Sequence, residues 1–101
     1  MASFVKAAKA SELKSGDARV VEIEGKTYAL FNVEGKFYSI DNTCVHRGGP
    51  LGEGFLDGTV VTCPWHAWQY EVTTGACKTN PTVAVACHAT KVEGDDVLIS
   101  V

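Results

Sequence analysis

Short runs of apolar and β-branched residues, separated by glycine-containing turns, alternate along most of the chain. Residues 19–24 and 27–33 form two such runs around Gly25-Lys26, and a third run at residues 37–40 follows Glu34-Gly35-Lys36. Runs joined by a short glycine turn are typical of β-hairpins. Two successive hairpins predict an antiparallel meander, because parallel strands would need longer crossover connections.

The same pattern predicts further strands and an all-β fold, a small antiparallel β-sandwich or barrel. Ser11 and Gly16 are predicted to cap and to end a single helical turn within residues 11–17. The length of the chain fits one domain, residues 1–101. The remaining predicted strands are residues 3–8, 59–62 and 68–72 and a final hairpin of residues 90–93 and 97–101 around Gly94-Asp95-Asp96.

Residues 41–54 break the strand pattern, because four glycines and a proline fall within positions 48–54. Such a composition predicts a loop, neither helix nor strand. This loop contains Cys44 and His46, and a second short cluster, Cys63 and His66, follows after sixteen intervening residues. Two thiolates and two imidazoles suit a transition metal. These four residues are therefore the candidate metal ligands, in an inserted lobe at roughly residues 43–83.

The order of the ligands bears on the kind of metal centre. Zinc modules usually pair cysteine with cysteine and histidine with histidine, as C-x₂₋₄-C and H-x₃₋₅-H. Here each cluster combines one cysteine with one histidine, as C-x-H and C-x-x-H. This alternation favours a dinuclear [2Fe–2S] centre in which one iron takes both cysteines and the other takes both histidines. A zinc-binding module without redox activity is the alternative.

The two clusters lie in segments that resemble the two ligand boxes of the Rieske family. The segments read CVHRGGPL at residues 44–51 and CPWHAW at residues 63–68, and the resemblance extends over nearly the whole chain. It implies one [2Fe–2S] cluster, with Cys44 and Cys63 on the inner iron and His46 and His66 on the outer iron at the tip of the protein. It also places Pro81 in a third loop, residues 78–81, that covers the cluster.

The departures from this pattern suggest a low redox potential. Rieske proteins of the cytochrome bc complexes carry an additional cysteine in each box, and these two cysteines form a disulfide. The corresponding positions look like Gly49 and Trp65 here. A serine that donates a hydrogen bond to the cluster corresponds to Trp68, whereas Tyr70 matches a hydrogen-bonding tyrosine. Fewer donors stabilise the reduced cluster less, so we predict a midpoint potential on the order of −150 mV.

The resemblance implies a one-electron carrier that connects a flavin-containing reductase to a terminal oxygenase. The small subunit of an NAD(P)H-dependent nitrite reductase is the alternative, since it is similar in length and has tryptophan at the Trp68 position. A catalytic oxygenase is excluded, because its mononuclear iron needs two histidines beyond the cluster and only His88 is left. We therefore expect an electron-transfer protein and not an enzyme.

Charge and composition bear on the expected partners and cellular location of the protein. The net charge is −3 without a cluster of lysine and arginine, so no nucleic-acid partner is expected. The longest apolar run, residues 83–87, is too short to cross a bilayer, and no signal peptide is recognisable. The expected protein is a cytoplasmic monomer. Cys77 and Cys87 are expected to be small buried residues, His88 a surface or half-buried strand residue, and Trp65 a shield over the cluster or a partner contact.

Overall fold

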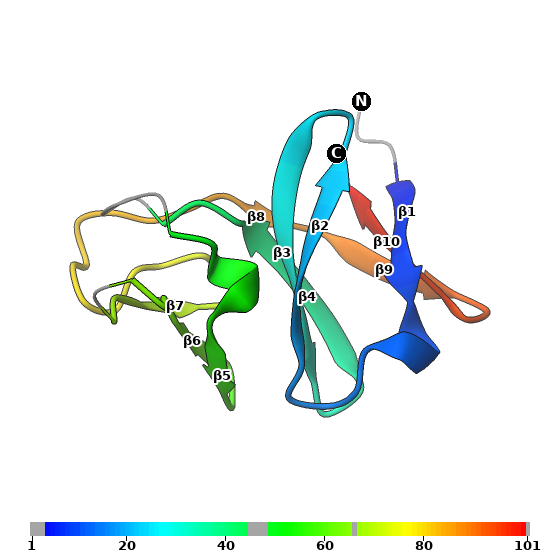
Figure 1. Cartoon of the computed structure of the whole chain (residues 1–101), viewed down its shortest axis with the longest axis horizontal. Coiled ribbons are helices and arrows are strands. Elements are labelled where there is room, and N and C mark those ends of the chain that lie inside the picture. Colours follow the sequence, from blue (N-terminus) through cyan, green and yellow to red (C-terminus); the bar gives the residue numbers. More distant parts are fainter. Residues whose placement is uncertain (1–3, 45–48, 66, 101) are drawn as a thin grey trace.

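The computed structural model describes residues 4–44, 49–65 and 67–100, and these residues form strands and two single-turn 3₁₀ helices (Figure 1). The all-β prediction is confirmed. Among the described residues no helix is long and apolar enough to cross a membrane. The strands are β1 (Phe4–Lys9), β2 (Ala18–Ile23), β3 (Lys26–Val33), β4 (Lys36–Asp41), β5 (Phe55–Asp57), β6 (Val60–Thr62), β7 (Gln69–Glu71), β8 (Cys87–His88), β9 (Thr90–Glu93) and β10 (Asp96–Ser100), and the 3₁₀ helices are η1 (Ala10–Glu12) and η2 (Leu51–Glu53).

Strands β2, β3 and β4 form the predicted antiparallel meander, and β8 adds a fourth strand beside β4. Both hairpin turns have two successive residues with positive φ, 52° and 80° at Glu24-Gly25 and 52° and 88° at Glu34-Gly35. Two such residues make a type I′ turn, whose twist matches that of the flanking strands. The first turn lies one residue earlier than predicted, because Lys26 already pairs with Ile23.

The second sheet, in the order β1-β10-β9, packs against the meander and encloses a core. Its central strand β10 alternates, so that Val97 and Ile99 are buried while their neighbours are partly exposed. Leu13, Tyr28 and Leu30 fill the same core from the other side. These two sheets form the predicted small β-sandwich.

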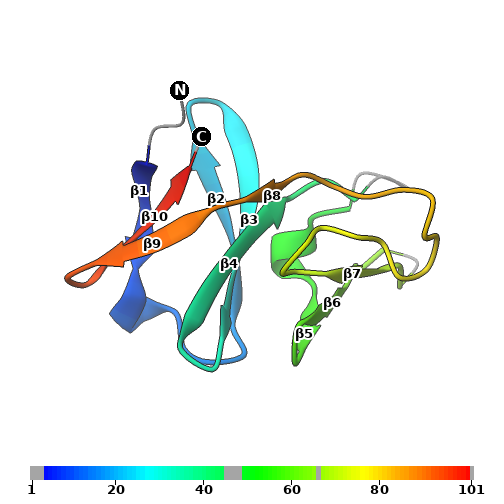
Figure 2. The same cartoon turned by 180° about the vertical axis from the view of Figure 1, so that it is seen from behind.

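The third sheet, β5-β6-β7, belongs to a lobe that lies beside the sandwich in both views (Figures 1 and 2). The chain leaves the sandwich at the end of β4 and returns at β8, which pairs with β4 through Ser39–His88 and Ile40–Cys87. The lobe is therefore an insertion between two neighbouring strands. Strand β5 was not predicted; its three residues follow a glycine loop, and its Phe55 is 72% exposed.

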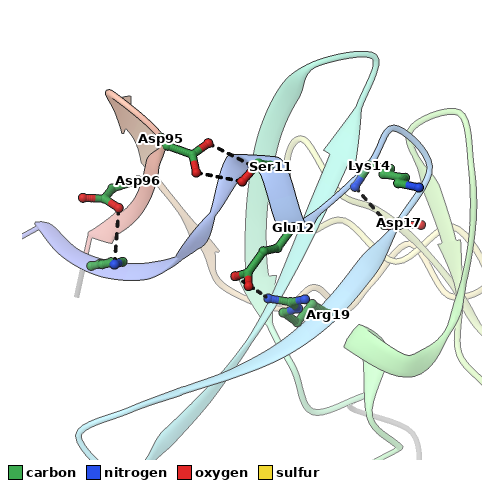
Figure 3. Close-up of polar contacts among 8 residues, drawn as sticks. Ser11, Glu12, Lys14, Asp17, Arg19, Asp95 and Asp96 are labelled. Atoms are coloured by element: carbon green, nitrogen blue, oxygen red, sulfur yellow. Dashed lines mark hydrogen bonds and ion pairs between the residues drawn. The ribbon is translucent and has the colours of Figure 1, made fainter.

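The two 3₁₀ turns correct the sequence-based predictions. Ser11 lies inside η1 and does not cap it: its backbone N–H and its Oγ donate to the Asp95 carboxylate at 3.0 and 2.7 Å (Figure 3). Gly16 lies beyond the end of η1, in the turn before β2, with φ of 89°. The turn η2 forms within the segment predicted to have no helix. It is held by Asn42, whose backbone carbonyl accepts from Leu51 N–H and whose Oδ1 accepts from Gly52 N–H.

Candidate metal centre

Cys44 and Cys63 each lie at the start of a loop that a backbone hydrogen bond closes. Cys44 follows the end of β4, and its N–H donates to the Gly49 carbonyl at 2.9 Å. Cys63 directly follows β6, and its N–H donates to the Trp68 carbonyl at 2.7 Å. The sheet β5-β6-β7 thus holds the second cysteine, and the end of the meander holds the first.

The two thiols are neighbours in the interior of the lobe. Cys44 and Cys63 are each 1% exposed, and neither forms a disulfide. Burial raises the pKa of the Cys63 thiol, the Cys44 side chain raises it further through a hydrogen bond and charge, and the Trp65 backbone N–H lowers it. The structure therefore brings together two sulfur atoms that are nineteen positions apart in the sequence.

Hydrogen-bond donors lie beside both sulfur atoms. The Tyr70 hydroxyl is 3.2 Å from Cys44 Sγ, and the Tyr70 ring is fully buried in β7. The Trp65 N–H lies 3.4 Å from Cys63 Sγ. Hydrogen bonds of this kind stabilise negative charge on a metal-bound sulfur. The Tyr70 contact is the one expected from the sequence. Trp68 packs against the buried cluster that contains Tyr70.

Gly49 and Trp65, the positions that correspond to a disulfide in the bc-type proteins, lie against each other. A Cβ on Gly49 would be 3.1 Å from Trp65 Cβ. In a disulfide the two Cβ atoms are about 3.8 Å apart, so these two positions are as close as the partners of a disulfide. Trp65 itself is 50% exposed.

The third loop, which begins at Lys78, is tied to the lobe by backbone and side-chain contacts. Lys78 N–H donates to the Gln69 carbonyl, and Gln69 N–H donates to Thr79 Oγ1. Asn80 N–H lies 3.3 Å from Cys77 Sγ. Cys77 is buried, as predicted, and its sulfur accepts this hydrogen bond within the loop.

Cys87 and His88 lie on opposite faces of the short edge strand β8, because successive side chains of a strand alternate. His88 is half-buried, as predicted, with Nε2 2.7 Å from Asp41 Oδ1 and its ring edge-on to Tyr28. Cys87 is exposed, so the prediction of a buried residue was wrong. Although the residue is exposed, neighbouring atoms shield its thiol from part of the solvent, and this desolvation raises the pKa of the thiol.

Glu71, at the end of β7, has a carboxylate that accepts hydrogen bonds from two threonine hydroxyls. Burial alone would raise its pKa, but hydrogen bonds donated by the hydroxyls of Thr59 at 3.1 Å and Thr73 at 2.8 Å, with the charge of Lys78, lower it below its usual value. These contacts connect the turn before β6 to the turn after β7. They support the lobe that positions Cys63.

His46 and His66 lie outside the described residues. Within residues 4–44, 49–65 and 67–100, no three of the histidine, cysteine and acidic side chains come together as a metal site. The candidate centre is therefore described through its two cysteines and the donors around them.

Comparison with known proteins decides the family. The family model described as "Rieske [2Fe-2S] domain" matches residues 3–93. The chain belongs to the Rieske [2Fe-2S] domain family. Over 89 residues it is 38% identical to the ferredoxin component of the naphthalene 1,2-dioxygenase system of Pseudomonas aeruginosa, covering 87% of this chain and 86% of that protein. It is 35% identical over 99 residues to the biphenyl dioxygenase ferredoxin subunit of Pseudomonas sp. strain KKS102, covering 96% and 91%.

Solved structures of similar proteins share the fold. A complex of reduced oxygenase and oxidised ferredoxin in carbazole 1,9a-dioxygenase matches with a TM-score of 0.89 and 31% identity, covering 96% of this chain and 92% of that chain. A protein from Mycobacterium tuberculosis, assigned as the small subunit of an NADH-dependent nitrite reductase, matches with a TM-score of 0.92 over 100% and 96% of the two chains. Its identity is 19%, so that likeness concerns the fold alone.

The described residues fit the cysteine half of a Rieske centre. Two buried neighbouring thiols provide the soft ligands that iron–sulfur clusters use, and donors lie beside both sulfur atoms. Sequence reasoning missed the roles of Asn42, which holds η2 through two hydrogen bonds, and of Cys77. A polar residue two positions before Cys44 is a weak signal, and nothing local identifies Cys77 as a loop acceptor.

Proposed function

We propose that this Rieske protein carries one electron at a time from a flavin-containing reductase to a terminal oxygenase. The observation that carries the proposal is the pair of buried, adjacent Cys44 and Cys63 thiols with the Tyr70 hydroxyl 3.2 Å from one sulfur. The relatives named above are ferredoxin components or subunits of dioxygenase systems. The protein acts as an electron-transfer component and not as an enzyme by itself.

In this proposal Cys44 and Cys63 bind the inner iron and His46 and His66 bind the outer iron of one [2Fe–2S] cluster. When bound, the cluster accepts and releases one electron. The four protein ligands leave it electrically neutral when oxidised, because two ferric ions balance two sulfides and two thiolates. The charge added on reduction is then stabilised by the donors near Cys44 and Cys63. Residues 1–101 act as one domain, with the cluster in the lobe of roughly residues 43–83.

The ligand assignment is tested by electron paramagnetic resonance (EPR) of the reduced protein. We expect the low mean g value of mixed cysteine and histidine ligation. His46→Ala and His66→Ala should each lose this signal, because each removes one ligand of the outer iron. His88→Ala is the matched control and should keep it, because His88 is paired with Asp41. A signal typical of four cysteines, or a colourless protein, would exclude the assignment.

The proposed partners are tested by reconstitution. A purified flavin reductase and the oxygenase of an aromatic-ring dioxygenase system should show turnover of the aromatic substrate only when this protein is added. The nitrite reductase alternative predicts instead that the protein supports an NAD(P)H-dependent nitrite reductase. The ferredoxin interpretation fits better, because the two relatives named above, at 38% and 35% identity, are ferredoxins of dioxygenase systems, and the nitrite reductase likeness is one of fold. We further propose that the protein is a cytoplasmic monomer.

A further inference from the structure

Gly49 occupies a position where the structure leaves no room for a side chain. A Cβ there would lie 2.7 Å from Cys63 Sγ and 3.0 Å from Trp65 Cγ, closer than such atoms approach in relaxed proteins. Its φ is not positive, so the requirement for glycine is one of space and not of backbone conformation. The missing side chain lets Gly49 lie directly against Cys63 and Trp65.

Trp65 occupies the surface next to this contact. Trp65 is 50% exposed as a residue, whereas the nearby Cys63 is only 1% exposed. The Trp65 backbone N–H lies 3.4 Å from Cys63 Sγ. Trp65 Cγ, where the indole begins, and Cys63 Sγ both border the space beside the Gly49 Cα. Part of the indole is thus packed over the place where the two boxes meet, and the rest faces solvent.

We propose that Trp65, packed on Gly49, keeps water away from Cys63 Sγ and thereby holds the midpoint potential low. This inference rests on the proposed function, because it assumes that Cys63 is an iron ligand. Trp65 does not bind the metal in this proposal; it controls how much water reaches Cys63 Sγ. Glycine is needed at position 49, because a side chain there would push the indole away from Cys63.

The direction of the effect follows from charge. Reduction adds one negative charge to a neutral centre, and part of this charge resides on the ligand sulfur atoms. Water near Cys63 Sγ would donate hydrogen bonds and stabilise the reduced form, which raises the potential. Excluding water therefore acts in the same direction as the absence of a serine donor at Trp68. A large aromatic side chain at position 65 is suited to this role, because its ring takes up the space that water would need, while the hydrogen bond from Trp65 to Cys63 Sγ comes from the backbone N–H.

The test is a size series, Trp65→Phe, Trp65→Leu and Trp65→Ala, in the cluster-containing protein. The midpoint potential should rise as the side chain becomes smaller, and Trp65→Ala should shift the equilibrium with a fixed redox mediator about tenfold, about 59 mV for one electron. Pulsed EPR after exchange into D₂O should show stronger deuterium coupling in the same order. If Trp65→Ala fails to retain the cluster, Trp65→Phe and Trp65→Leu still give the trend.

Phe55→Ala is the matched control, because Phe55 is an exposed aromatic residue of the same lobe on β5. It should leave both the potential and the deuterium coupling unchanged. If the wild-type EPR signal is normal but neither quantity changes along the size series, this inference is wrong and the proposed function stands. If the wild-type protein lacks the mixed-ligand signal, both are wrong.

The role of Gly49 is tested by a double mutant. Gly49→Ala should lower cluster content, because the new methyl group meets both Cys63 Sγ and Trp65. Gly49→Ala combined with Trp65→Ala should restore part of the cluster content, because the double mutant lacks Trp65 Cγ, which would lie 3.0 Å from the new methyl group. Its potential should be raised as in Trp65→Ala alone. A Gly49→Ala protein with wild-type cluster content and potential would contradict the close contact on which the inference depends.

Discussion

Replacing Tyr70 by phenylalanine removes one oxygen atom from the lobe and should lower the midpoint potential. The Tyr70 hydroxyl is 3.2 Å from Cys44 Sγ. The ring is fully buried and packs with Val61 and Val72 in the core of the lobe. Phenylalanine retains this packing, so the change isolates the hydroxyl.

The magnitude follows from the hydrogen bond. A hydrogen bond in a protein contributes about 1 kcal/mol, and more when one partner is charged. If the bond to the sulfur strengthens by about 1 kcal/mol when the centre gains an electron, its loss disfavours reduction by that amount. For a one-electron couple this corresponds to a fall of about 40 mV. The fall is opposite in sign to the rise expected for the smaller residues at position 65.

A potentiometric titration followed by EPR or visible absorption measures this shift. Tyr38→Phe is the matched control, since Tyr38 lies on β4 in the sandwich, and it should leave the potential unchanged. An unaltered potential in Tyr70→Phe, with a normal EPR signal, would refute the argument that this hydroxyl stabilises the reduced centre. A rise in potential would refute its sign.

Three further predictions concern stability, measured by urea unfolding. Gly75→Ala should cost about 3 kcal/mol, because the position has φ of 83° and a Cβ would strike the Val85 carbonyl. Gly58→Ala should cost about 1 kcal/mol, because its φ is 61° but the space around it is open. Equal costs would contradict the steric argument. The pKa of Glu71 is lowered in the folded protein, so its contribution to the free energy of unfolding is present above the usual value of 4.5 and is lost as pH falls through the lower folded value. Glu71→Gln should therefore weaken the pH dependence of stability below pH 4.5, and an identical pH profile in the mutant would count against this argument. Asp95→Ala should cost about 1 kcal/mol through the two lost hydrogen bonds to Ser11, and an unchanged unfolding midpoint would show that this contact does not matter.

The sequence predicted most accurately the strands that short glycine turns join into hairpins. The hairpins around Gly25 and Gly35 were found, because alternation and a glycine turn are encoded within about fifteen residues. The same reasoning misplaced the first turn by one residue, since pairing between Ile23 and Lys26 sets the register. Strands β5 and β8 were missed, because two or three residues are too few for a pattern, and they exist through pairing with β6 and β4.

Sequence by itself determined the family and the candidate ligand set, because the two boxes are local and highly specific in spacing. It did not determine how these segments meet. Only the tertiary structure brought Cys44 beside Cys63 and placed the Tyr70 hydroxyl near Cys44 Sγ. It alone showed that Gly49 leaves room for Trp65 and that Cys87 is exposed. The physical reason is that these contacts join residues distant in sequence, and the packing of the lobe and the pairing of β8 decide them.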